Sequence, residues 1–382
     1  MVGKRISALL FLLLIVAVPC AMAYNGFRLP LPNFNQLGDN LSAYVGSVEE
    51  QLQEHFPMGE TIKGWIMQLQ RFGGQERFSV EDGGTRKEIY LAGDSLILDV
   101  PAASAEDLAP KLEYVKSFMD SAGVPGAFVA IPTAAAIEQQ KISNYAPLFN
   151  QKQYIEDLYH LLEGSLILVD SYSSLFANRD QYLYYRTMPS MTMLGGWYVY
   201  EALGEKLSFG VRSLEEFNVQ YLTTEYLGNL YQLLPISGVK GDAVALYQYV
   251  GHDRHYVVTH FSHEEIWSYD RLYLPPEELD GEEITNAVLG ESSPVTLIET
   301  DLSSENRLLL IGDNSARSYL PFLTNHYSTI CYLDLSLADQ EDLQRIVLQE
   351  YDQVLFSYQV DQLTEEIPFE KLEWMRKSNP SQ

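Results

Sequence analysis

Short apolar runs separated by helical stretches constrain most strongly what this chain can fold into. Five such runs occupy residues 127–131, 166–169, 308–311, 330–335 and 354–358. The stretches between them carry apolar residues at helical spacing. Apolar strands that alternate with helices predict a parallel sheet covered by helices on both faces. We therefore expect an α/β fold with its functional site at the carboxyl ends of the strands.

The N-terminus has the pattern of an export signal. Lys4 and Arg5 precede an apolar stretch at 6–23, and the small residues at its end form a cleavage motif before Tyr24. The stretch is also close to the lower limit for a helix that spans a bilayer. Residues 1–23 are therefore predicted to be a signal peptide, with an uncleaved signal anchor as the alternative. Both place the remainder outside the cytoplasm, either secreted or tethered to the membrane.

The remainder is predicted to form an arm and one large domain. Residues 24–86 are expected to be an N-terminal helical arm, since their second half has apolar residues at helical spacing. Residues 87–382 are expected to form the α/β domain. The segment at about 207–306 interrupts the helix–strand alternation with tyrosine-rich, acidic and strand-like sequence. We interpret it as a β-rich insertion.

The charge of the chain excludes one class of partner. It has 25 lysines and arginines against 52 aspartates and glutamates, a formal net charge of −27. Phosphate backbones repel such a chain, so no nucleic-acid partner is expected. The 26 tyrosines are able to form a sugar-stacking surface, although packing in cores and interfaces is their commoner use. Protein partners are left open.

One string looks catalytic but is better explained as a turn. Residues 93–96 read GDSL, the signature of a class of serine esterases, and Asp157 and His160 supply a D-x-x-H pair. The residues around Gly93 and Asp94 alternate as two strands do, which places Ser95 in a hairpin instead of before a helix. We reject the pair as a catalytic site.

Four of the seven histidines crowd into one stretch, at His252, His255, His260 and His263. Imidazoles with nearby carboxylates are typical ligands of zinc. The stretch between the second and third of them has a strand pattern, however, and residues five apart on a strand face opposite sides. No metal site is expected, and these four remain only weak candidates. No cofactor is expected either.

Three segments carry a resemblance to a known family. Residues 124–137 read VPGAFVAIPTAAAI, 181–202 read QYLYYRTMPSMTMLGGWYVYEA, and 308–335 read LLLIGDNSARSYLPFLTNHYSTICYLDL. In this order they resemble the DHHW family, exported SGNH-hydrolase-like proteins similar to the alginate O-acetyltransferases. The resemblance implies a three-layer α/β/α sandwich of SGNH type with a mainly parallel sheet, and an association with polysaccharide acetylation.

The departures from the family pattern fall on its catalytic residues. The family motif Thr-Asp-His-His-Trp-Thr is replaced by TMPSMT at 187–192, so Met188 occupies the aspartate position and Ser190 the position of the catalytic histidine. Asn314 occupies the position of the nucleophilic serine. None of these three side chains can perform the chemistry of the residue it replaces.

The lost triad predicts a non-catalytic protein that binds, or serves as a scaffold for, a cell-surface or extracellular glycan. The glycan follows from the resemblance alone. The alternative is an O-acetylesterase or O-acetyltransferase that uses a non-standard set, for which Asp313, Ser315 and His326 are the weak candidates. Restoring the family residues is expected to be tolerated unless Met188 packs into a closed core.

Overall fold

The computed structural model describes residues 74–143, 146–251, 254–263, 265–279 and 284–378. The chain divides into two compact units, one of Glu76–Leu234 with Gly238–Gln382 and one of Met1–Gln75 with Pro235–Ser237. The predicted signal segment and most of the predicted arm lie outside the described residues. Every described helix and strand belongs to the larger unit. Within the described part, no helix is long and apolar enough to cross a membrane.

An eight-stranded mixed sheet forms the centre of this unit, in the order β5-β4-β13-β11-β12-β10-β8-β9. The five apolar runs of the sequence make its parallel part: β4 (Gly126–Ile131), β5 (Ile167–Val169), β11 (Arg307–Gly312), β12 (Thr329–Leu333) and β13 (Gln353–Gln359). Three antiparallel strands extend it: β8 (Tyr256–Phe261), β9 (Ile266–Tyr269) and β10 (Val295–Thr300). The expected α/β fold is confirmed.

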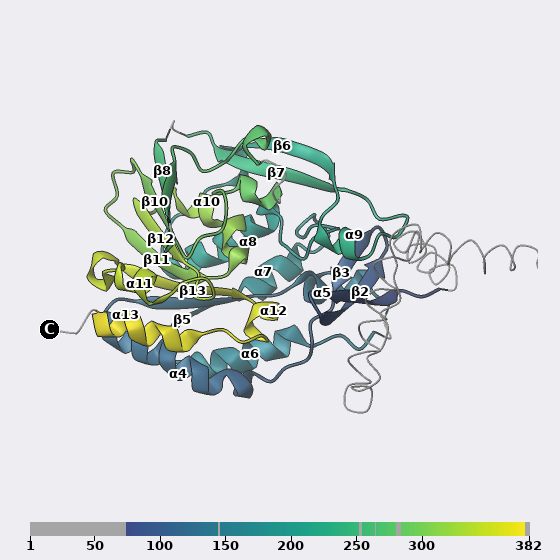
Figure 1. The fold of residues 1–382 in the computed structure, drawn as a ribbon, viewed down its shortest axis with the longest axis horizontal. Helices are drawn as coiled ribbons and strands as arrows, with labels where there is room; N and C mark the ends of the chain where they lie inside the picture. The colour runs from purple at the N-terminus through teal and green to yellow at the C-terminus, as the bar shows by residue number, and fades with distance from the viewer. Residues whose placement is uncertain (1–73, 144–145, 252–253, 264, 280–283, 379–382) are drawn as a thin grey trace, which may run out of the picture. The chain divides into compact units, whose positions relative to one another are not determined.

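Helices pack on both sides of the parallel strands (Figure 1). One side carries α4 (Ala105–Ala122), α6 (Gln151–Leu162) and α13 (Leu372–Ser378), and the other carries α7 (Ser171–Ala177), α8 (Met193–Leu207) and α10 (Leu320–Leu323). On β4, Phe128 and Val129 belong to different core clusters because successive side chains point to opposite faces. Both faces of the strand are buried, which explains why its sequence is uninterruptedly apolar.

Short helices complete the connections between these elements. They are α5 (Ala134–Ile137), α9 (Asn229–Leu233), α11 (Gln340–Gln344) and α12 (Val360–Leu363). Two of them, α5 and α12, directly follow the central strands β4 and β13, so the chain turns sharply at the carboxyl ends of these strands.

A separate three-stranded sheet contains the predicted hairpin. It consists of β1 (Arg77–Asp82), β2 (Thr85–Ala92) and β3 (Ser95–Leu98), all antiparallel. Ala92 pairs with Ser95 across the turn, and Gly93 has the positive φ of 69° that such a turn favours. The hairpin interpretation is confirmed. Residues 77–86, predicted as the end of the helical arm, instead contribute β1 and the start of β2.

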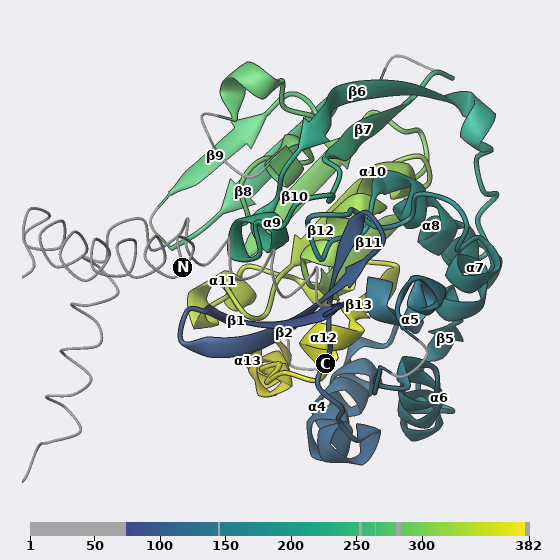
Figure 2. The ribbon, with the colours of Figure 1, turned by 90° about the vertical axis from the view of Figure 1, so that its right-hand side faces the viewer.

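The β-rich segment 207–306 both covers and extends the main sheet. Its first strands, β6 (Phe217–Tyr226) and β7 (Asp242–Tyr249), form an antiparallel ribbon (Figure 2). Its later strands are β8, β9 and β10, which join the main sheet beside β12. The segment is therefore partly continuous with the sheet that it interrupts in sequence.

Gly196 on α8 allows a close approach that fixes the turn after β11. A Cβ atom at this position would lie 2.5 Å from the carbonyl carbon of Ser318. We expect Gly196→Ala to lower the free energy of unfolding by about 2–3 kcal/mol, because backbone atoms cannot move aside without displacing the turn. Denaturant unfolding measures this. Gly210→Ala is the control, since its Cβ would meet no atom within 4 Å; equal stability of the two variants would contradict the close approach.

Candidate functional site

A cleft of about 320 Å³ opens where the carboxyl ends of β11, β12 and β13 meet. This is the edge of the sheet at which the sequence predicts a site. The lining residues come from five stretches, 185–193, 244–246, 284–292, 313–318 and 359–362, together with Asp334 and Ser336 after β12. The cleft is thus built from segments that are far apart in the chain.

The turn after β11 is held by the carboxylate of Asp313. One of its oxygens accepts a hydrogen bond from the backbone N–H of Ser315 at 2.8 Å, and the other accepts from the N–H of Gln359 at 2.6 Å. Gly312 comes so close to the carbonyl oxygen of Ser357 on β13 that a Cβ atom would clash with it. Asp313 therefore links the ends of two neighbouring strands.

Burial makes the carboxyl groups of the cleft more basic than usual. It raises the pKa of Asp313 to about 7, although hydrogen bonds from Ser315 and Gln359 oppose the shift. Burial also raises the pKa of Asp334 and that of Asp361, two further carboxyls in the lining. Removal from water disfavours the charged form, so these groups hold protons to higher pH than exposed aspartates do.

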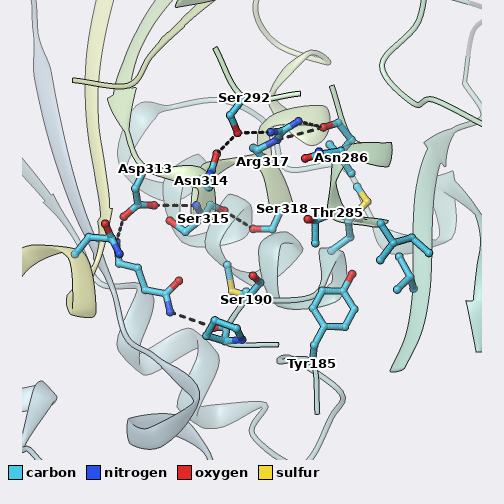
Figure 3. Close-up of a pocket in the computed structure, with 18 of the residues that line it drawn as sticks. Tyr185, Ser190, Thr285, Asn286, Ser292, Asp313, Asn314, Ser315, Arg317 and Ser318 are labelled. Atoms are coloured by element: carbon cyan, nitrogen blue, oxygen red, sulfur yellow. Dashed lines mark hydrogen bonds between the residues drawn. The ribbon is translucent and has the colours of Figure 1, made fainter. Parts of the chain in front are cut away.

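Asn314 stands at the mouth of the cleft in a chain of hydrogen bonds (Figure 3). Its Oδ1 accepts from Ser292 Oγ at 3.1 Å, and Ser292 Oγ accepts from Nη1 of Arg317 at 3.0 Å. The buried guanidinium of Arg317 also donates to the carbonyl oxygens of Val288 and Gly290. The orientation of the Asn314 amide is therefore fixed, and an amide of this kind can donate and accept hydrogen bonds but is no nucleophile.

The degenerate motif forms a loop held by a buried carboxylate. Asp242, at the start of β7, is fully buried and accepts hydrogen bonds from the backbone N–H of Arg186 at 2.5 Å and of Thr187 at 3.0 Å. The hydroxyls of Tyr182 and Thr187 also donate to it. Asp242 is not among the residues predicted from the sequence. Its only signal was an aspartate at the head of an otherwise apolar strand, where burial demands partners.

The three degenerate positions do not all lie in the cleft. Ser190 and Asn314 line it, whereas Met188 is only 2% exposed and packs with Tyr185 and Val244 in a small apolar cluster. Met188 thus packs into a closed core, which is the condition under which restoring the family residues was not expected to be tolerated. The position that the resemblance gives to the family carboxylate is thus held by a buried hydrophobic side chain.

The alternative catalytic set is not brought together. Asp313 and Ser315 both line the cleft, but His326 is absent from its lining. The ring of His326 stacks on Phe209 at a centroid distance of 4.3 Å, and its Nε2 lies 2.6 Å from the hydroxyl of Tyr200. Burial lowers the pKa of His326 to about 4. This histidine packs in an aromatic stack and has no carboxylate or serine of the cleft beside it.

The histidine stretch also disperses. His252 lies outside the described residues, His255 and His263 are exposed, and His260 is buried on β8 with its Nδ1 within 3.1 Å of two hydroxyls. Across the described ranges, no three histidine, cysteine or acidic side chains are grouped so that they could hold a metal ion. Ser95, the serine of the rejected GDSL string, is buried in the hairpin.

Known proteins resemble this chain in fold but hardly in sequence. No protein-family model matches the chain, and no curated protein matches its sequence. A solved DHHW family protein from Eubacterium siraeum superposes with a TM-score of 0.56 and 18% identity, over 80% of this chain and 97% of that one. The chain has the fold of the DHHW family. The resemblance seen in the sequence is thereby confirmed at the level of the fold.

A second solved structure shares the DHHW fold. PatB1 of Bacillus cereus, determined with a sulfonyl adduct, superposes with a TM-score of 0.63 at 15% identity, over 74% of this chain and 98% of that one. Both matches cover nearly the whole of the known chains. At such identity the likeness concerns the fold, and chemistry has to be argued from the residues of the site.

Met188 provides a direct test of how the site has been remodelled. We expect Met188→Asp to lower the free energy of unfolding by about 3 kcal/mol or more, because a carboxylate without partners would be buried in an apolar cluster. Ser190→Asp places the same side chain at a position that lines the cleft and should cost far less. Thermal unfolding of the two variants measures the difference. Equal melting temperatures would show that Met188 is not in a closed core.

The raised pKa of Asp313 predicts a pH dependence of stability. Between about pH 4 and pH 7 the folded chain keeps a proton on Asp313 that the unfolded chain releases. This contribution is complete below the unfolded pKa and is lost as pH rises through the folded pKa. Between about pH 5 and pH 8 the melting temperature of Asp313→Asn should therefore fall less than that of wild type. Asp120→Asn, at an exposed position on α4, should follow wild type; parallel curves for all three would contradict the shift.

Proposed function

We propose that this chain is a non-catalytic relative of SGNH-type hydrolases that binds a glycan in the cleft. One observation carries the proposal. Ser190 and Asn314, at the positions that the resemblance gives to base and nucleophile, line the cleft, and no described histidine does. Serine-type hydrolases cleave esters with a serine hydroxyl that a neighbouring base activates. An amide at one position and an unassisted hydroxyl at the other retain polar contacts without that chemistry.

The lining of the cleft suits a polyhydroxylated ligand. Amide, hydroxyl and carboxyl groups from Asn314, Ser315 and Asp334 line it together with the apolar side chains of Met191 and Val244. Sugar hydroxyls both donate and accept hydrogen bonds, as these groups do, while sugar C–H faces pack on apolar walls.

The proposal extends to architecture and location. It takes the fold to be a three-layer α/β/α sandwich of SGNH type, whose mainly parallel core is extended by the segment 207–306. It takes residues 1–23 to be an export signal or anchor, so that the protein acts outside the cytoplasm, secreted or membrane-tethered. The ligand would then be a cell-surface or extracellular glycan, and the role that of a binding or scaffold component in polysaccharide acetylation.

One observation favours a catalytic alternative. Asp313, with a pKa of about 7, lies in the cleft and its carboxylate accepts from the backbone N–H of Ser315. A carboxyl that titrates near neutrality is a competent general base. An O-acetylesterase or O-acetyltransferase would then use Ser315 with Asp313 and without His326.

A sulfonyl fluoride separates the two possibilities. PatB1 is known with a sulfonyl adduct, and Asn314, at the position that the resemblance gives to the nucleophile, has no hydroxyl to modify. We expect intact-mass spectrometry of the purified chain to show no adduct and an aryl acetate to be hydrolysed no faster than by Ser315→Ala. An adduct mapped to Ser315 or Ser190, or a rate that vanishes in Ser315→Ala, would establish the enzyme instead.

Glycan binding itself is tested in the cleft. Affinity gel electrophoresis with soluble neutral, uronate-containing and amino-sugar polysaccharides should reveal retardation of the wild-type chain. Asn314→Trp, at an exposed position, should fill the mouth of the cleft and reduce that retardation by about tenfold in apparent Kd. If no polysaccharide retards the wild-type chain, or if Asn314→Trp binds as well as wild type, the cleft is ruled out as the glycan site.

A further inference from the structure

A second cavity, of about 290 Å³, lies against the β6–β7 ribbon and shares no lining residue with the cleft. Its walls come from β6, β7, the start of β8, the residues 270–273 and Pro321 on α10. Both ribbon views place β7 beside α10 (Figures 1 and 2). We propose that this cavity is a saccharide-binding site in which tyrosine rings stack on a sugar and Arg254 donates hydrogen bonds to it. The proposal goes beyond the glycan site in the cleft and does not depend on it.

The walls of the cavity are aromatic and held in place. Four half-buried tyrosines line it: Tyr247, Tyr249, Tyr256 and Tyr273. The hydroxyl of Tyr273 donates to the backbone carbonyl of Tyr247 at 2.7 Å. Tyr249 packs against Phe217 with ring centroids 5.6 Å apart. Rings already fixed by packing lose little freedom when a ligand arrives, so contact with them carries a low entropic cost.

Arg254 supplies a fixed donor beside these rings. Its Nη1 donates to the carbonyl oxygen of Thr324 at 3.1 Å, and its guanidinium carbon lies 5.7 Å from the centre of the Tyr249 ring. Its Nε is buried and has no hydrogen-bond partner. In the described ranges no carboxylate forms an ion pair with Arg254, whereas the neighbouring Arg271 is paired with Asp270 at 2.8 Å. Because the Nε is closed to solvent, a ligand oxygen in the cavity would meet the rest of the guanidinium, which no described carboxylate neutralises.

The chemistry of the rim favours a sugar over other ligands. Gln220 and Gln248 are exposed there, and their planar amides can pair with adjacent hydroxyls. Aromatic walls combined with a few fixed polar groups are typical of small-molecule sites, and this volume suits one or two rings better than a protein segment. A nucleic acid is disfavoured by the net charge of −27. In this proposal, tyrosines of the segment 207–306 contact a ligand in addition to packing against the fold.

The decisive experiment uses the full chain with its cleft blocked by Asn314→Trp, so that binding reports on the second cavity alone. The probes are a neutral polysaccharide, hydroxyethyl cellulose, and a uronate polysaccharide, alginate, in affinity gels and by titration calorimetry with their oligomers. We expect at least one probe to bind. Adding Tyr249→Ala should weaken binding by about tenfold or more, and adding Arg254→Met should weaken it by a comparable factor.

Matched variants protect the test against misfolding. Tyr221→Ala, on the same ribbon but 61% exposed and outside the lining, should leave binding unchanged. Gln248→Trp changes an exposed rim residue and should block the cavity without disturbing the core. Absence of binding by the cleft-blocked chain, or equal affinity of the Tyr249→Ala and Tyr221→Ala variants, would overturn this proposal. Binding by wild type that Asn314→Trp alone abolishes would leave the cleft as the glycan site and refute only the second one.

Discussion

The link between β11 and β13 is the interaction on which the site depends. Gly312 permits two parallel strands to end side by side, and the carboxylate of Asp313 then ties the turn after one strand to the backbone of Gln359 on the other. The cost of burying this carboxyl appears as its raised pKa. The link acts together with the close packing of Gly196 against Ser318 to position the turn that carries Asn314 and Ser315.

The buried carboxylate of Asp242 has the corresponding role for the opposite wall. It accepts hydrogen bonds from the backbone N–H groups of Arg186 and Thr187 and so holds the start of the segment 187–192 in place. Support and chemistry are therefore separable in this fold. Met188, at the position that the resemblance gives to the catalytic aspartate, is part of an apolar cluster. A cleft kept in shape in this way is suited to binding.

The ribbon of β6 and β7 connects the two candidate ligand sites. Val244 and Leu246 on β7 face the cleft, whereas Tyr247 and Tyr249 line the second cavity. One strand thereby contributes to two chemically different surfaces, one rich in carboxyls and the other rich in tyrosines. The segment that interrupts the helix–strand alternation is thus the part of the chain that distinguishes this protein's surface from a bare α/β domain.

The sequence by itself determined the five parallel strands and the β2–β3 hairpin, because each depends on local pattern: apolar runs or the turn chemistry of Gly93. Only the tertiary structure decided that β8 and β10 extend the sheet, that His326 packs in an aromatic stack and that Tyr249 lines a second cavity. These outcomes depend on contacts between residues distant in the chain, such as Thr187 with Asp242 across 55 positions, and no local pattern encodes which distant partner a buried group will find.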